Sequence, residues 1–250
     1  MGRLERRCPG VDVRAHGTVA VGWARAGNSD RAREMLVPWP ERYPDPAPKD
    51  WEPFARACIR VGDLPPAIRC FEQYRARAAP VQNTQYRAGA YRIVVEGWVF
   101  AAIVAGHARF LATAEDIANE MMTFTEITHD GMRPLRAFCD LALGYNMFGN
   151  AAKASDAMAR AEDLREVLLT TDRVGLAWER MRRTAEIGKA WAALGSPDQS
   201  LQKYHIAVET AAGESASPAA LGQAVHSLGQ ALELVWWHRW VARRGRPSVP

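Results

Sequence analysis

A pattern of residues around a turn glycine occurs four times in this chain and limits its fold more than any other feature. The glycines are Gly27, Gly62, Gly149 and Gly195. Apolar residues stand eight and four positions before each glycine, and a large residue stands nine positions after it. Small residues stand seven before and five after. Two antiparallel helices joined at the glycine would bring these residues into one interior. The predicted core consists of Val19, Trp23, Phe54, Phe71, Leu141, Tyr145, Ile187, Trp191 and Tyr204.

The residues at each turn fit the end of one helix and the start of the next. Glycine tolerates the left-handed backbone that commonly ends a helix. Asn28, Asp63, Asn150 and Ser196 follow the four glycines directly, and such side chains can accept hydrogen bonds from the free amides of a new helix. Because a helical hairpin cannot bury its apolar face alone, we expect the repeated hairpins to stack into a solenoid.

The segment from Trp51 to Pro80 resembles the tetratricopeptide repeat family. Gly27 and Gly62 are separated by nearly the family's repeat length of about 34 residues, whereas Gly149 and Gly195 lie further apart. The segment 92–122 fits the spacing poorly, and is either a degenerate repeat or a functional insertion. The resemblance implies an all-α, right-handed α–α superhelix of about five antiparallel helical hairpins with a closing C-terminal helix. The residues that carry it are Trp51, Phe54, Ala55, Cys58, Gly62, Ala67, Phe71 and Pro80.

The pattern places one helical-repeat domain at 15–241, between a flexible basic N-terminus at 1–14 and a flexible basic tail at 242–250. The prolines of the segment 38–48 predict an extended loop between the first two helical pairs. The segment 219–241 is expected to form the closing helix that covers the last apolar face. The helical pairs are predicted at 15–37, 50–79, 88–122, 133–166 and 174–212.

The composition favours a soluble, cytoplasmic protein. Apolar residues make up 48% of the chain, too many for a disordered segment. The cysteines contain no CxxC pair, which favours free thiols in a reducing compartment. The segment 1–10 lacks the apolar stretch of a signal peptide, and the longest apolar run, 97–106, is about half of what a membrane span requires. The cysteines are Cys8, Cys58, Cys70 and Cys139.

No pattern in the sequence indicates catalysis, so we expect no enzymatic activity, no cofactor and no metal. Glu126 and His129 have the spacing of one half of a di-iron site, but the second such pair is missing. His205 and Glu209 share a helix face without the HExxH frame of a zinc site. The chain also lacks the glycine-rich phosphate loops and the Gly-x-Ser-x-Gly elbow.

The resemblance implies a concave groove lined by the first helix of each hairpin. Basic residues outnumber acidic ones at the corresponding positions. Arg56 and Arg60 are one helical turn apart and could hold a carboxylate from two sides. The predicted groove residues are Arg25, Lys49, Arg56, Arg60, Arg136, Asn146, Arg182 and Lys189.

The expected function is therefore that of an interaction scaffold, which binds a peptide segment of acidic character in this groove. A second interpretation is a solvated charged face without any ligand. The third is binding of RNA or DNA, because the formal charge is +4 and the isoelectric point is about 9.0. The irregular repeat lengths count against a base-by-base RNA code. If the chain is a piece of a larger protein, a DNA-reading module would lie elsewhere.

The predicted closing helix ends in a cluster of tryptophans followed by arginines. Trp236 and Trp240 are four residues apart and share a helix face. These side chains either seal the end of the repeat array, or dock onto a partner or a second copy, or lie on a membrane surface.

Overall fold

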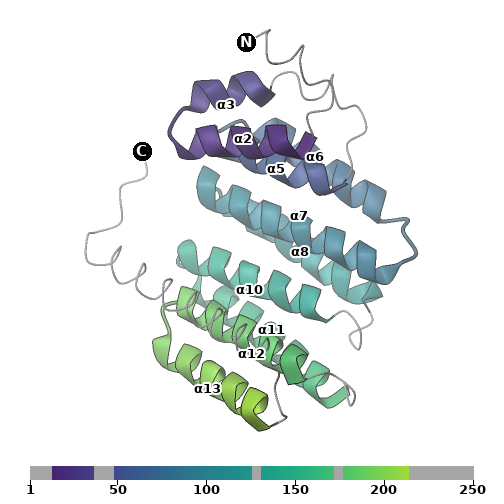
Figure 1. The fold of residues 1–250 in the computed structure, drawn as a ribbon, viewed down its shortest axis with the longest axis vertical. Helices are drawn as coiled ribbons and strands as arrows, with labels where there is room; N and C mark the ends of the chain where they lie inside the picture. Colours follow the sequence, from purple (N-terminus) through teal and green to yellow (C-terminus); the bar gives the residue numbers. More distant parts are fainter. Residues whose placement is uncertain (1–12, 37–47, 126–130, 172–176, 214–250) are drawn as a thin grey trace. The chain divides into compact units, whose positions relative to one another are not determined.

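The computed structural model describes residues 13–36, 48–125, 131–171 and 177–213, and all regular structure within these ranges is helical (Figure 1). The predicted all-α class is thereby confirmed for the described residues. The predicted termini, the proline-rich loop and the closing helix lie wholly or mainly outside them. The helices are α2 (Val13–Arg25), α3 (Ser29–Leu36), α5 (Pro48–Arg60), α6 (Leu64–Ala78), α7 (Thr84–Ala105), α8 (Arg109–Phe124), α10 (Met132–Met147), α11 (Ala151–Thr171), α12 (Ala177–Ala193) and α13 (Pro197–Gly213).

Each of the five predicted helical pairs is present, and in all five the same turn joins the two helices. The turn glycine has a positive φ of 70–80° in every pair, including Gly106 between α7 and α8. The amide after the glycine donates a hydrogen bond to the carbonyl four residues before the glycine, which is the Schellman arrangement. The donor and acceptor residues are Asn28 and Trp23, Asp63 and Cys58, His107 and Ala102, Asn150 and Tyr145, and Ser196 and Trp191, at 2.9–3.0 Å.

The predicted helix-capping role is confirmed for two of the residues that follow the glycines. The Oδ1 atom of Asn28 accepts from the amide of Arg31 at 3.1 Å, and Asn150 accepts in the same way from Lys153. The prediction is wrong for Asp63, whose side chain makes no capping hydrogen bond. The next amides within its reach would belong to Pro65 and Pro66, and proline has no N–H to donate.

Gly62 offers a direct test of this turn. Its φ is +80°, and a Cβ added there would meet nothing within 4 Å. The whole cost of a side chain is therefore backbone strain, and we expect Gly62→Ala to lower the free energy of unfolding by about 1–2 kcal/mol in a denaturant titration. Gly62→Asn should cost less, because asparagine enters this region more readily. Equal stability of all three proteins would contradict the turn geometry.

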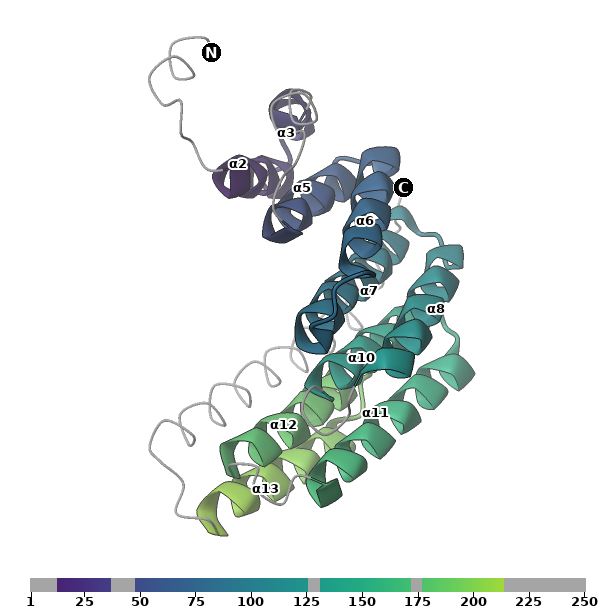
Figure 2. The same cartoon turned by 90° about the vertical axis from the view of Figure 1, so that its right-hand side faces the viewer.

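The chain divides into two compact units, Met1–Ile117 and Ala118–Pro250, and each is described by itself. In the first unit α5 contacts both α2 and α7, so that the first helices of successive pairs pack on one another (Figure 2). The second helix α6 packs on α7, where the ring centroids of Phe71 and Trp98 are 5.8 Å apart. Trp98 also contacts Phe110 of α8 at 5.5 Å, which links α7 to its own partner helix.

The second unit repeats this arrangement with α10–α13. The first helices α10 and α12 contact each other, and α12 also contacts α11, the second helix of the preceding pair. Leu135, Leu141 and Ile187 are fully buried there. The indole Nε1 of Trp191 on α12 donates a hydrogen bond to Glu162 on α11 at 3.0 Å. In both units, therefore, the first helix of a pair rests on the second helix of the pair before it.

The predicted core is correct at six positions and wrong at two. Phe54, Phe71, Leu141, Tyr145, Ile187 and Tyr204 are buried. Trp191 is half-buried because its indole reaches the polar Glu162. Val19 and Trp23, in contrast, are 47% and 38% exposed. They lie on α2, the first described helix, and no described pair precedes it to cover them.

The helix α7 has a length and an apolar composition that a membrane-spanning helix would also have. Its 22 residues are apolar enough to cross a bilayer by length and composition, and 56% of its most apolar stretch is buried inside the molecule. Tyr91, Val94 and Val95 are fully buried against other parts of the chain. The core helix of a soluble protein can have the same length and composition.

Candidate functional site

The predicted groove residues lie on the first helices of their pairs, as expected. Five of them have described side chains, and all five are half-buried. The side chains of Arg25, Lys49 and Arg182 lie outside the described set. The five are Arg56 and Arg60 on α5, Arg136 and Asn146 on α10, and Lys189 on α12.

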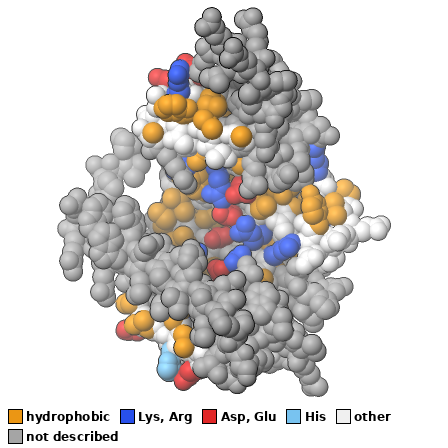
Figure 3. All heavy atoms as spheres, in the orientation of Figure 1, with side chains coloured by type: hydrophobic (Ala, Val, Ile, Leu, Met, Phe, Trp, Pro, Cys, Tyr) orange, Lys and Arg blue, Asp and Glu red, His pale blue; other side chains and the backbone are white. Residues whose placement is uncertain are grey.

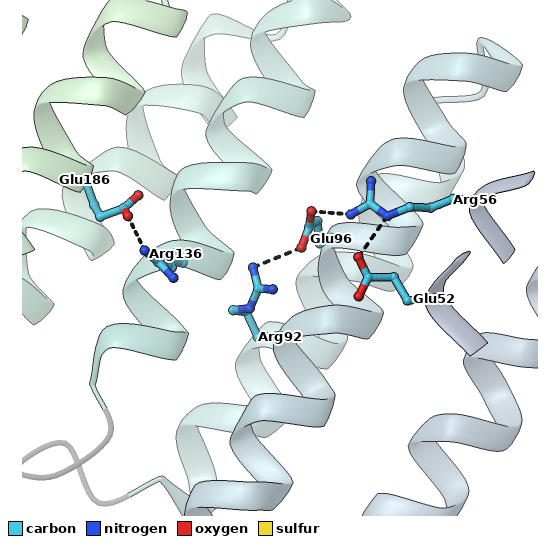
Figure 4. Close-up of polar contacts among 6 residues, drawn as sticks. All are labelled: Glu52, Arg56, Arg92, Glu96, Arg136 and Glu186. Carbon is cyan, nitrogen blue, oxygen red and sulfur yellow. Dashed lines mark hydrogen bonds and ion pairs between the residues drawn. The ribbon is translucent and has the colours of Figure 1, made fainter. Parts of the chain in front are cut away.

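Arg56 is already held by carboxylates of its own chain (Figure 4). Its Nε donates to Glu52, one turn earlier on α5, at 3.0 Å. Its terminal nitrogen donates to Glu96 on the neighbouring helix α7. Burial lowers the pKa of the Arg56 guanidinium, but Glu96 and Glu52 outweigh this effect and raise it above its ordinary value. Arg56 therefore stays positively charged, and two carboxylates of its own chain hold its side chain in place.

Glu96 is a functional candidate that the sequence reasoning missed. It joins two arginines, because Arg92 on α7 also donates to it at 2.9 Å. Arg56, Arg92 and Glu96 are each between a quarter and a third exposed. The spacing of Arg92 and Glu96 by four residues was a signal for their ion pair. The segment 92–122 fits the repeat spacing poorly, so the sequence predicts no groove residues there.

An aromatic ring completes the arrangement in the first unit. The guanidinium carbon of Arg60 stands 4.9 Å from the ring centroid of Phe100, and that of Arg56 stands 5.4 Å from it. A guanidinium over an aromatic face is held in a fixed plane by cation–π attraction. The three guanidinium groups of Arg56, Arg60 and Arg92 thus lie together with the carboxylates of Glu52 and Glu96 where α5 meets α7. We call these residues with Phe100 the arginine cluster.

The second unit carries a related but smaller arrangement. Arg136 on α10 donates to Glu186 on α12, so again an arginine and a glutamate link the first helices of successive pairs. Asn146 and Lys189 are half-buried on these same helices. A separate polar network centres on Glu162 of α11. The Glu162 carboxylate accepts hydrogen bonds from Trp191 on α12 and, at 2.7 Å, from Lys203 on α13. This network joins three helices and has a structural role.

Among the described side chains on the face drawn in Figure 3, basic and acidic groups lie side by side. The ion pairs described above have the same mixture of charges. This mixture disfavours nonspecific binding to a phosphate backbone, which requires clustered positive charge.

The titratable residues of the described part of the chain include an exposed histidine–glutamate pair and two buried thiols. No group of three or more His, Cys, Asp and Glu side chains there could hold a metal ion. His205 and Glu209 form an exposed pair at 3.2 Å, and the Glu126–His129 motif lies outside the described residues. Cys58 and Cys70 are free thiols, as predicted, and both are buried. Burial raises the pKa of Cys70 to about 12 and that of Cys58 further, so both stay protonated and unreactive.

A comparison of the sequence with models of known protein families finds no match, and a comparison with curated proteins finds none either. The residues of the site itself are therefore the basis for assigning a function.

Proposed function

We propose that this chain is a tetratricopeptide-like interaction scaffold, whose helical pairs stack into a right-handed superhelix and whose first helices bind a peptide segment of a partner protein. The proposal rests mainly on the arginine cluster. Its side chains come from the first helices of two successive pairs, which is where the family resemblance places the ligand. Each is half-buried and held by neighbours, so a ligand would meet ordered groups and lose little entropy in binding them.

The chemistry of the arginine cluster favours a peptide with acidic side chains. Guanidinium groups bind carboxylates in two-pronged pairs, and a partly buried site strengthens such pairs. The ordered guanidinium groups of the cluster could share their hydrogen bonds with the carboxylates of a ligand. Phe100 adds an apolar surface beside these groups, suited to the aliphatic part of a glutamate side chain.

A direct binding assay tests the proposal. The probe is a fluorescein-labelled peptide of alternating glutamate and alanine with a free C-terminal carboxylate, followed by fluorescence anisotropy. Arg60→Gln should weaken binding by about tenfold or more, because a hydrogen bond to a charged partner contributes about 1.5–3 kcal/mol. Arg77→Gln is the matched control, since it removes the same charge from the exposed surface of α6.

Two further probes separate the alternatives. A peptide with glutamine in place of glutamate should bind much more weakly to the wild-type protein. A single-stranded RNA oligonucleotide should compete poorly. Equal affinity for both peptides would reject a carboxylate site, and tight RNA binding that Arg60→Gln and Arg77→Gln weaken alike would favour the nucleic-acid alternative.

A further inference from the structure

Of the two carboxylates in the arginine cluster, that of Glu96 makes the more extensive contacts. Its Oε1 accepts a hydrogen bond from Arg56 on α5, and its Oε2 lies 2.9 Å from a terminal nitrogen of Arg92 on α7. Each oxygen therefore meets a different guanidinium group, and Glu96 lies between the two arginines (Figure 4). Glu52, by comparison, pairs with Arg56 one turn along its own helix.

The position of the Glu96 carboxylate is one that an acidic side chain of a ligand would also seek. Guanidinium groups bind carboxylates of either origin through the same N–H contacts. The side chains of Glu96, Arg56 and Arg92 are 29%, 26% and 25% exposed, so all three can be reached from solvent. A ligand carboxylate that contacts both arginines would come close to the Glu96 carboxylate, and the two negative charges would repel each other.

Arg56 has other contacts that would hold it in place without Glu96. Its Nε donates to Glu52 at 3.0 Å, and its guanidinium carbon stands 5.4 Å from the ring centroid of Phe100. Neither contact involves Glu96. If the Glu96 carboxylate moved away, Arg56 would stay ordered and gain an N–H group for another acceptor. An ordered donor of this kind loses little entropy when a ligand binds to it.

From these observations we infer that Glu96 is a built-in competitor of the peptide ligand, whose acidic side chain takes the place of the Glu96 carboxylate between Arg56 and Arg92. The inference rests on the proposed function, because it requires that an acidic peptide binds to the arginine cluster. A competitor lowers the affinity for every carboxylate that binds there. It thereby favours peptides that also contact neighbouring groups, such as Arg60 and Phe100, over small molecules with a single carboxylate.

A purely structural role for Glu96 predicts a different result. If Glu96 served only to join α5 to α7, removal of its charge would loosen the arginines and weaken both the fold and peptide binding. For a competitor, the two effects have opposite signs. The variant is less stable, because two ion pairs are lost, and yet it binds the acidic peptide more tightly.

Fluorescence anisotropy of the full chain with the labelled glutamate–alanine peptide tests the inference. Glu96→Gln should bind the peptide about fivefold or more tightly than the wild type, because the repulsion between like charges is removed. Glu96→Met keeps a side chain of similar length without the charge and should have the same effect. Glu72→Gln is the matched control, since it removes the same charge from the exposed surface of α6. Thermal unfolding followed by circular dichroism checks that each variant is folded and measures the loss of stability.

The possible outcomes distinguish this inference from the proposed function. Tighter binding by both Glu96 variants, with unaltered binding by Glu72→Gln, would support the inference. Peptide binding that Arg60→Gln weakens, but that Glu96→Gln leaves unchanged or weakens, would overturn the inference and leave the proposed function in place. An equal gain in Glu72→Gln would also overturn it, because the overall charge would then explain the effect. No binding by the wild type or by either Glu96 variant would reject the proposed function, and the inference with it.

Discussion

Replacing Phe71 with alanine is expected to lower the free energy of unfolding by about 3–5 kcal/mol, the largest effect of any change considered for this chain. Phe71 is 3% exposed and contacts Trp98 of the next pair. Its ring also fills the space over Gly97, where an added Cβ would come within 2.4 Å of the ring carbons. Truncation would therefore open a cavity between two successive pairs. Urea denaturation followed by circular dichroism measures the loss.

Two companion variants show whether the loss comes from this fit. Phe71→Leu should cost less than Phe71→Ala, because leucine leaves a smaller cavity. Gly97→Ala should destabilise the protein in the presence of Phe71 through overpacking, by about 1–3 kcal/mol. The same change should be tolerated better when it is combined with Phe71→Leu in a double variant. A loss of less than about 1 kcal/mol for Phe71→Ala would contradict the close packing of Phe71 between α6 and α7.

Reversing the charge of Arg56 is expected to lower the free energy of unfolding by about 1–3 kcal/mol. The variant Arg56→Glu would place a third carboxylate beside Glu52 and Glu96, which Arg56 now joins. It would also leave Arg92 as the remaining described ion-pair partner of Glu96. Thermal unfolding of the variant at low and high salt measures the repulsion, which salt should partly screen.

The charge-swapped double variant is the control for this prediction. Arg56→Glu combined with Glu96→Arg restores opposite charges across α5 and α7 and should recover part of the lost stability. The non-additive part of the double-mutant cycle gives the coupling between the two side chains. Additive losses would mean that the two side chains do not interact. Because Arg56→Glu damages the fold, Arg60 is the better residue for testing peptide binding.

The helical pairs were predictable from sequence because their turns depend on local chemistry. The glycine, the polar residue after it and the small residues on either side all lie within a few positions of one another, so spacing alone identifies them. Gly106 shows the limit of this approach. It adopts the same turn as the other four glycines, but the residues around it follow a shifted spacing, so the pattern match was poor there.

The site was less predictable because it depends on which helices meet. Spacing predicted that Arg56 and Arg60 share one side of α5, and both guanidinium groups stand over the ring of Phe100. It did not reveal that Glu96, forty positions away, would hold Arg56. The same limit explains the error at Val19 and Trp23. Their pattern is that of buried residues, and only the packing of α2 showed that no described helix covers them.

The five identical turns have a consequence for how chains of this kind can change in length. Each turn is closed by a hydrogen bond between residues five positions apart, so the turn itself does not depend on contacts with a neighbouring hairpin. Insertion or loss of a whole hairpin leaves the remaining turns intact, whereas a cut inside one separates a glycine from its carbonyl acceptor. Recombination at the joints between hairpins would therefore yield proteins with more or fewer hairpins while each turn keeps its closing hydrogen bond.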